Sequence, residues 1–117
     1  MVHVELSLQT KSEANMREHW ATKARRVKMQ RGVVTMALRQ HAEQLEALRG
    51  AEVIVATLIR VSPRRLDDDN LRGALKAVRD AVAAWVGIDD GSERYKWCYD
   101  QRKGALGVQI EIRNLKT

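Results

Sequence analysis

Residues 64–71 read Arg64-Arg65-Leu66-Asp67-Asp68-Asp69-Asn70-Leu71, and this stretch joins the most apolar predicted strand of the chain to its most regular predicted helix. Three consecutive aspartates are unusual in a chain with 21 Lys+Arg, 15 Asp+Glu and a formal net charge of +6. A second acidic pair, Asp89-Asp90, follows the end of that helix. Carboxylates at both ends of one helix in a basic protein indicate a divalent cation bound near a polyanion.

The elements on either side of the aspartates follow from hydrophobic periodicity. Residues 70–86 place apolar side chains on one side at about 100° per residue, which predicts a helix that Gly87 ends. Residues 51–61 are apolar on both faces, which is typical of a strand at the centre of a sheet. Pro63, the only proline of the chain, ends that strand.

The two ends of the chain predict further strands. Residues 2–8 alternate between apolar and polar, which indicates a half-buried strand that pairs antiparallel with a neighbour. Residues 94–101 and 106–112 are predicted as strands joined by a tight turn at Lys103-Gly104, so we expect a hairpin. Tyr95, Trp97 and Tyr99 lie on one face of the first of them, and we expect that face to point inward rather than to stack on bases.

The longest periodic segment covers residues 15–48 and predicts helix with a single apolar stripe. A straight helix of that length would measure about 50 Å, too long for a domain of 117 residues. We therefore expect a bend near Gln30-Arg31-Gly32, the alternative being a long arm that packs on a second subunit. The order β-α-β-α-β-β then predicts one α+β domain over residues 1–117, with a small mixed sheet and helices packed on one face.

Composition limits where the protein acts. Cys98 is the only cysteine, so no intrachain disulfide can form, and we expect a cytoplasmic protein. The longest apolar run, residues 53–59, is far shorter than the roughly 20 residues of a membrane span, so no membrane partner is expected. The three histidines have no partners at zinc-ligand spacing, and no motif for a small-molecule cofactor is present.

Basic residues are concentrated before the predicted bend. Residues 11–31 contain seven Lys or Arg and two Glu, which predicts a face that follows DNA phosphates; the alternative is an ordinary solvated helix face. Arg64 and Arg65 either contact DNA or screen the neighbouring aspartates. The predicted DNA-binding residues are Lys23, Arg25, Arg26, Lys28, Arg31, Arg64 and Arg65.

The acidic stretch has a structural interpretation and a metal-binding one. Asp and Asn before a helix are common N-caps, which accounts for one or two of the aspartates but not for all of them. In an extended segment Asp67 and Asp69 point to the same side and Asp68 to the other, so the first and third are the candidate ligands. Carboxylate oxygens suit Mg²⁺, but spacing alone does not bring Asp90 to them, because the chain must fold back along the helix.

The same residues resemble the RusA-type Holliday-junction resolvases of phages and bacteria. That family has Asp-x-Asp-Asn-Leu at the start of a helix, an aspartate within it and an Asp-Asp pair after it; this chain has residues 67–71, Asp80 and residues 87–90. The resemblance implies a homodimeric endonuclease, dependent on Mg²⁺ with Mn²⁺ as an alternative, that resolves four-way DNA junctions by paired symmetric nicks in recombination, repair or phage DNA processing. It implies metal ligands at Asp67, Asp69 and Asp90, supported by Asn70, Asp80 and Asp89.

Two features depart from the family pattern. The family's N-terminal strand often leads into a Pro-Pro-Ser-x-Asn turn, whereas residues 12–15 of this chain keep a Ser and an Asn without prolines. The family has a catalytic lysine three residues after the asparagine, where this chain has Gly73. Lys76, one turn later, is our candidate for stabilising the charged phosphate, and an ion pair with Asp80 is its structural alternative. The missing lysine keeps open a catalytically silent homodimer that binds DNA junctions. A third alternative is a structural protein whose aspartates serve as helix caps or as a cation-stabilised corner.

Overall fold

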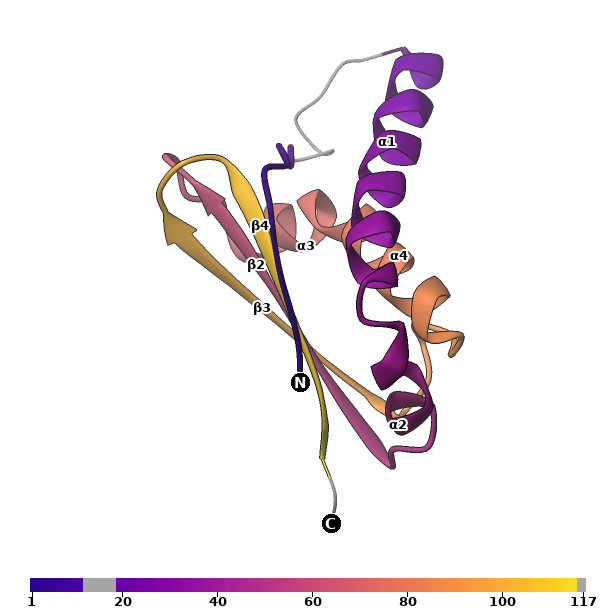
Figure 1. Ribbon diagram of the computed structural model, residues 1–117. Coiled ribbons are helices and arrows are strands. Elements are labelled where there is room, and N and C mark those ends of the chain that lie inside the picture. Colours follow the sequence, from indigo (N-terminus) through magenta and orange to yellow (C-terminus); the bar gives the residue numbers. More distant parts are fainter. Residues whose placement is uncertain (12–18, 116–117) are drawn as a thin grey trace.

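A computed structural model describes residues 1–11 and 19–115 of the chain, and in these residues four α-helices accompany a mixed four-stranded sheet (Figure 1). The strands are β1 (Val2–Leu6), β2 (Val53–Ser62), β3 (Tyr95–Lys103) and β4 (Gly107–Leu115). The helices are α1 (Trp20–Arg39), α2 (Leu45–Arg49), α3 (Asp68–Ala74) and α4 (Lys76–Val86), with a short 3₁₀ turn, Ala42–Gln44, before α2. The predicted α+β class with a mixed sheet is confirmed.

The strand order in the sheet is β1-β4-β2-β3, with β2 and β3 parallel and the other pairs antiparallel. The central position of β2 and the antiparallel pairing of β1 are as predicted. The predicted hairpin is wrong, because β3 and β4 lie on opposite sides of β2 and do not pair with each other. Val108, Ile110 and Ile112 of β4 are almost fully buried and suit an interior strand, whereas the exposed Lys96 and Asp100 of β3 suit an edge.

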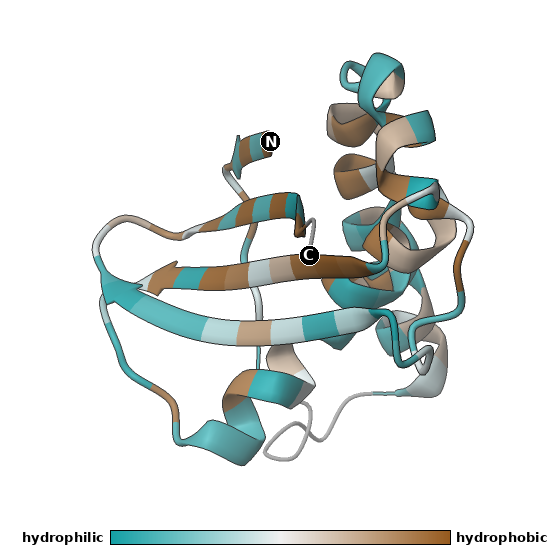
Figure 2. Ribbon diagram, turned by 90° about the horizontal axis from the view of Figure 1, so that it is seen from below, coloured by the Kyte–Doolittle hydropathy of each residue, from teal (hydrophilic) through white to brown (hydrophobic). Residues whose placement is uncertain are grey.

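The core lies between one face of the sheet and the helices, and Figure 1 shows α1, α2 and α4 on that side. Ile54 and Leu58 of β2 pack there with residues of α1, α3 and α4 in one buried cluster. Figure 2 shows the hydrophobic colouring concentrated along β2, while much of β3 is hydrophilic. The opposite face of the sheet carries the buried Val55 and Ile59 of β2 together with polar side chains, among them His3, which lies 3.4 Å from Glu111.

Helix α1 is continuous through Gln30-Arg31-Gly32, so the expected bend is wrong. The chain instead leaves the helix after Arg39 and passes through the 3₁₀ turn to α2. Continuity is favoured because Gln30 is buried and its side-chain amide donates to the Gln9 carbonyl at 2.9 Å, while Val34 is fully buried one turn later. The part of the expected helix at residues 15–18 lies outside the described residues.

The first half of α1 extends beyond the core. None of residues 20–29 is buried, and Gln30 is the first buried residue of the helix. In Figure 1 the first turns of α1 stand beyond the ends of the strands. This half is therefore available to a partner.

The helix predicted over residues 70–86 is divided in two at Leu75. Leu75 has φ −99° and ψ 4°, outside the regular helical range, and its backbone N–H is shared between the carbonyls of Leu71 and Arg72. Gly73, a poor helix former, precedes the break, and the fully buried Leu75 side chain anchors it in the core. Gly87 ends α4 with φ 84°, as its position predicted.

Candidate acidic site and nucleic-acid interface

Asp67 is the N-cap of α3. One of its carboxylate oxygens accepts a hydrogen bond from the Asn70 backbone N–H at 2.9 Å, and the other accepts from the Asn70 side-chain amide at 3.0 Å. The helix begins at Asp68, two residues earlier than predicted, so Asp68 and Asp69 lie exposed in its first turn. Contrary to the prediction, Asp67 and Asp69 therefore do not share one side of an extended run, because the chain is helical from Asp68.

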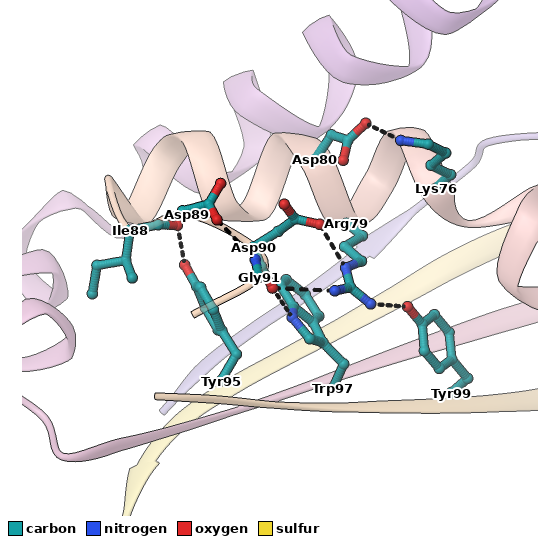
Figure 3. Close-up of polar contacts among 10 residues, drawn as sticks. All are labelled: Lys76, Arg79, Asp80, Ile88, Asp89, Asp90, Gly91, Tyr95, Trp97 and Tyr99. Atoms are coloured by element: carbon teal, nitrogen blue, oxygen red, sulfur yellow. Dashed lines mark hydrogen bonds and ion pairs between the residues drawn. The ribbon is translucent and has the colours of Figure 1, made fainter. Parts of the chain in front are cut away.

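The chain does fold back after α4, as a shared site requires. Asp90 accepts a hydrogen bond from Nε of Arg79 at 3.0 Å, and Arg79 lies in the first turn of α4 (Figure 3). The Asp90 carbonyl accepts from Nη2 of the same guanidinium at 3.1 Å and from the Trp97 indole at 2.9 Å. Asp90 is thus held against the beginning of α4, although it follows the end of that helix in the sequence.

Arg79 is the centre of this arrangement. Its Nη1 donates to the Tyr99 hydroxyl at 2.8 Å, and its guanidinium carbon lies 4.7 Å from the centre of the Trp97 ring (Figure 3). Burial lowers the pKa of Arg79, but the bonds to Tyr99 and Asp90 outweigh it, and the pKa lies above its usual value. The aromatic residues face inward, as predicted, and they support this arginine.

The network reaches α3 through Tyr99. The guanidinium of Arg72 lies 5.7 Å from the centre of the Tyr99 ring, and Asp69 precedes Arg72 by one helical turn. Asp69 and Asp90 therefore stand near opposite ends of a chain of contacts made by two arginines and one tyrosine. This chain of contacts joins the helix that carries Asp69 to the loop that carries Asp90.

The three predicted ligands fit a magnesium ion by their chemistry but not by their positions. Their chemistry fits, because all three offer carboxylate oxygens. Their positions do not, because among residues 1–11 and 19–115 no three Asp, Glu, His or Cys side chains are grouped so that they could hold a metal ion. The structure thus does not assemble Asp67, Asp69 and Asp90 into one ligand set, and Arg79 serves as the cation that accompanies Asp90.

A hollow of about 360 Å³ lies between α1 and the end of α4. Its polar lining consists of Asp80, Asp89, Asp90 and Arg31, and its apolar lining comes from α4 and the turn after it. One carboxylate oxygen of Asp89 accepts from the Gly91 N–H at 3.2 Å, which shapes this turn. The predicted supporting aspartates and a predicted DNA-binding arginine therefore share one concave surface.

Lys76 is the first residue of α4, and its ammonium lies 3.2 Å from the Asp80 carboxylate. This is the ion pair that the sequence offered as the structural alternative for Lys76. Both side chains reach the surface, where such a pair contributes only about 0.3–0.5 kcal/mol, so it holds Lys76 weakly.

The predicted DNA-binding cations form two groups. Helix α1 contains six basic residues and no acidic one: Lys23, Arg25, Arg26, Lys28, Arg31 and Arg39. A hollow of about 500 Å³ on its surface is lined by Lys23, Lys28, Arg31 and the exposed Trp20, among others. Arg64 and Arg65 belong to a separate cationic hollow beside the ends of β2 and β3.

Sequence reasoning missed Arg79 and Arg72. Arg79 stands one position before Asp80 in a helix with ordinary periodicity, and nothing local indicates which carboxylate it faces. Its partner is determined by the return of the chain after Gly87, which is a tertiary feature. The inward-facing tyrosines and tryptophan of β3 were the available signal, because a buried aromatic cluster favours an arginine stacked against it.

Comparisons with known proteins leave the motif resemblance without independent support. A scan against protein-family models finds no match for this chain, and a search of curated proteins finds no similar sequence. Among the described residues, no helix is both long enough and apolar enough to cross a membrane.

Proposed function

We propose that the protein is a metal-dependent endonuclease that acts on branched DNA, including four-way junctions, as a homodimer. The observation that carries this proposal is the hollow in which Arg31, from a helix without acidic residues, faces Asp80, Asp89 and Asp90. Cations that bind phosphates and carboxylates that suit a divalent cation are needed side by side in phosphodiester hydrolysis. The resemblance of residues 67–71 and 87–90 to the RusA-type resolvases supports the same activity.

The first half of α1 supplies the DNA contact in this proposal. Its cations stand on a segment without buried residues, so a duplex can approach them without disturbing the core. Phosphates near these side chains would displace condensed counterions, which makes binding strongly dependent on salt. Arg31, which directly follows the first buried residue of α1, would hold a phosphate close to Asp89 and Asp90.

The acidic residues would then serve the reaction. Asp67, Asp69 and Asp90 do not form one ligand set in the structure, so in this proposal DNA binding would have to bring their carboxylates together before they could hold Mg²⁺ or Mn²⁺. A bound ion would supply positive charge to polarise the phosphate and to lower the pKa of a water. Arg79 keeps Asp90 beside α4, and Asn70 keeps the Asp67 carboxylate at the start of α3. Lys76 can reach a phosphate only after it leaves Asp80, which a weak surface pair permits.

The test is incubation of the purified protein with a synthetic four-way junction and Mg²⁺, with nicks resolved on denaturing gels. Asp69→Asn removes one candidate ligand charge, and Asp68→Asn removes the same charge from the neighbouring exposed position. We expect Asp69→Asn to abolish nicking while junction binding persists, and Asp68→Asn to cleave like the wild type. Tight junction binding without nicks at any divalent metal would overturn the enzymatic proposal.

A second candidate is a catalytically silent homodimer that binds DNA junctions. The observation that favours it is that Asp90 is paired with Arg79 and Lys76 with Asp80. In that case all charge-neutralising variants of the aspartates bind junctions as well as the wild type, and no metal supports cleavage.

A further inference from the structure

A second cationic hollow, of about 360 Å³, lies where the parallel strands β2 and β3 end. It is lined by Ser62, Pro63, Arg64, Arg65, Gln101, Arg102 and Lys103. Four of these seven residues are cationic and none is acidic. The sequence drew attention only to Arg64 and Arg65, because Arg102 and Lys103 come from a strand some forty residues later and join them through the parallel pairing of Ser62 with Lys103.

Side-chain clamps hold the backbone of this hollow in place. The Gln101 amide donates to the Leu66 carbonyl at 2.7 Å, and its oxygen accepts from the Leu66 N–H at 3.0 Å. The buried Arg60 donates to the Arg64 carbonyl at 2.8 Å and to the Thr10 hydroxyl at 3.2 Å. The segment that carries Arg64 and Arg65 is therefore fixed to the sheet at both of its ends.

The cations of this hollow have no acidic partners among the described residues. Arg102 donates to the Gln109 side-chain oxygen at 3.2 Å, which is a neutral contact. Asp100, the nearest acid on β3, accepts from the Gln101 N–H at 2.8 Å, and both Asp67 oxygens accept from Asn70. Arg60 adds a buried positive charge behind the hollow, also without a described carboxylate partner. Like charges gathered in this way repel one another unless an anion joins them.

We propose that this hollow binds a phosphate of the DNA backbone, as an anchoring point separate from α1. The hydroxyl of Ser62 and the guanidinium groups of Arg64, Arg65 and Arg102 offer the donors that recognise phosphate oxygens. The hollow immediately precedes the acidic run, so a strand anchored there passes the first turn of α3. This inference rests on the proposed DNA binding and adds a second contact region to it.

The test compares two double variants that remove the same charge. Arg102→Ala with Lys103→Ala removes two cations of the hollow, while Lys96→Ala with Arg113→Ala removes two exposed cations elsewhere in the sheet. DNA affinity is measured by fluorescence anisotropy with a labelled duplex at several salt concentrations, after circular dichroism confirms folding. We expect the first pair alone to weaken binding and to reduce the slope of log K against log salt by about 1 to 2. Equal losses in both pairs, or none in either, would overturn the inference.

A second experiment distinguishes a DNA phosphate from a small free anion as the ligand of the hollow. Inorganic phosphate at millimolar concentration is added while the melting temperature of the wild type and of the Arg102/Lys103 variant is measured. If phosphate stabilises the wild type alone while DNA affinity is the same in both, the hollow is a small-anion site and the inference fails. If the wild type binds no DNA at all, the proposed function fails with it; if the hollow variant binds and cleaves like the wild type, only the hollow inference fails.

Discussion

Arg79 and Asp90 are joined twice, by a hydrogen bond of 3.0 Å from Nε to the carboxylate and by one of 3.1 Å from Nη2 to the backbone carbonyl. The same guanidinium bonds Tyr99 and stacks on Trp97. One side chain thus ties the first turn of α4 to the loop that follows the helix and to the edge strand β3. The position of Asp90, and with it the shape of the acidic hollow, depends on this arginine.

Replacing Arg79 is expected to destabilise the fold. Arg79→Ala leaves Asp90 and Tyr99 without their charged donor, which should lower the free energy of unfolding by about 2–3 kcal/mol. Arg79→Lys keeps the charge, but one ammonium group cannot make the hydrogen bonds to Asp90 and Tyr99 that the planar guanidinium makes together. We therefore expect an intermediate loss of stability. Urea unfolding measures both, and Arg113→Ala, which removes an exposed arginine from β4, should stay close to the wild type. Equal stability of Arg79→Ala and wild type would contradict the role assigned to this network.

Two substitutions of Asp67 can separate its role as a helix N-cap from the role of its negative charge. Asparagine caps helices about as well as aspartate, so Asp67→Asn should unfold within about 0.5 kcal/mol of the wild type, whereas Asp67→Ala should lose about 1 kcal/mol. If Asp67 also serves catalysis, Asp67→Asn should lose junction cleavage despite its normal stability. Thermal unfolding and the cleavage assay on the same samples decide this, and cleavage by Asp67→Asn at the wild-type rate would leave Asp67 as a cap only.

Lys76 and Asp80 can be tested as a pair. Because their ion pair is exposed, Lys76→Ala and Asp80→Asn should each change the free energy of unfolding by no more than about 0.5 kcal/mol. A lysine that stabilises charge on the phosphate should be essential, so Lys76→Ala should slow cleavage by at least about 100-fold. Asp80→Asn frees Lys76 but removes one carboxylate of the acidic hollow, so its cleavage rate is compared with that of Lys76→Ala. A fully active Lys76→Ala would mean that this lysine serves only its pair with Asp80.

Tyr95 should make the free energy of unfolding depend on pH at high pH. Burial raises its pKa to about 12, and its hydroxyl donates to the Ile88 carbonyl at 3.0 Å. The folded state retains this proton while the unfolded chain, with a pKa near 10, releases it, so the free energy of unfolding should fall as pH rises from about 10 to 12. Tyr95→Phe should remove this part of the pH dependence in urea unfolding curves, and Tyr99→Phe, measured in parallel, should retain it.

What the sequence predicts well here is local. The two-sided apolar character of Val53 to Ile59 identifies the central strand, and Gly87 identifies the end of α4, because periodicity and backbone preference act within a few residues. Whether β3 pairs with β4 or with β2 depends on segments far apart in the chain, and a short turn at Lys103-Gly104 suits either arrangement. The break at Leu75 also escapes prediction, since a leucine continues the helical pattern and one glycine at position 73 does not by itself end a helix.

The residues of the candidate site also include some that the sequence reveals and some that it does not. The acids of residues 67–69 and 89–90 are visible as anomalies of charge, and Lys76 is visible by its spacing. The arginine that holds Asp90 and the cations that complete the hollow beside Arg65 are not visible, because the chain reaches them by folding back along α4 and by the parallel pairing of β3. Which charged side chains come into contact is decided by how the chain folds back on itself, and not by residue type.

The pairing of β1 with β4 has a consequence for how the protein is made. Val2 pairs with Ile112, so β1 can pair with β4 only after roughly 100 further residues have been synthesised. Until then its apolar side chains have no sheet to join, while α1 and the later helices can already form from local contacts. The sheet is therefore expected to close late, in a slow step of high contact order.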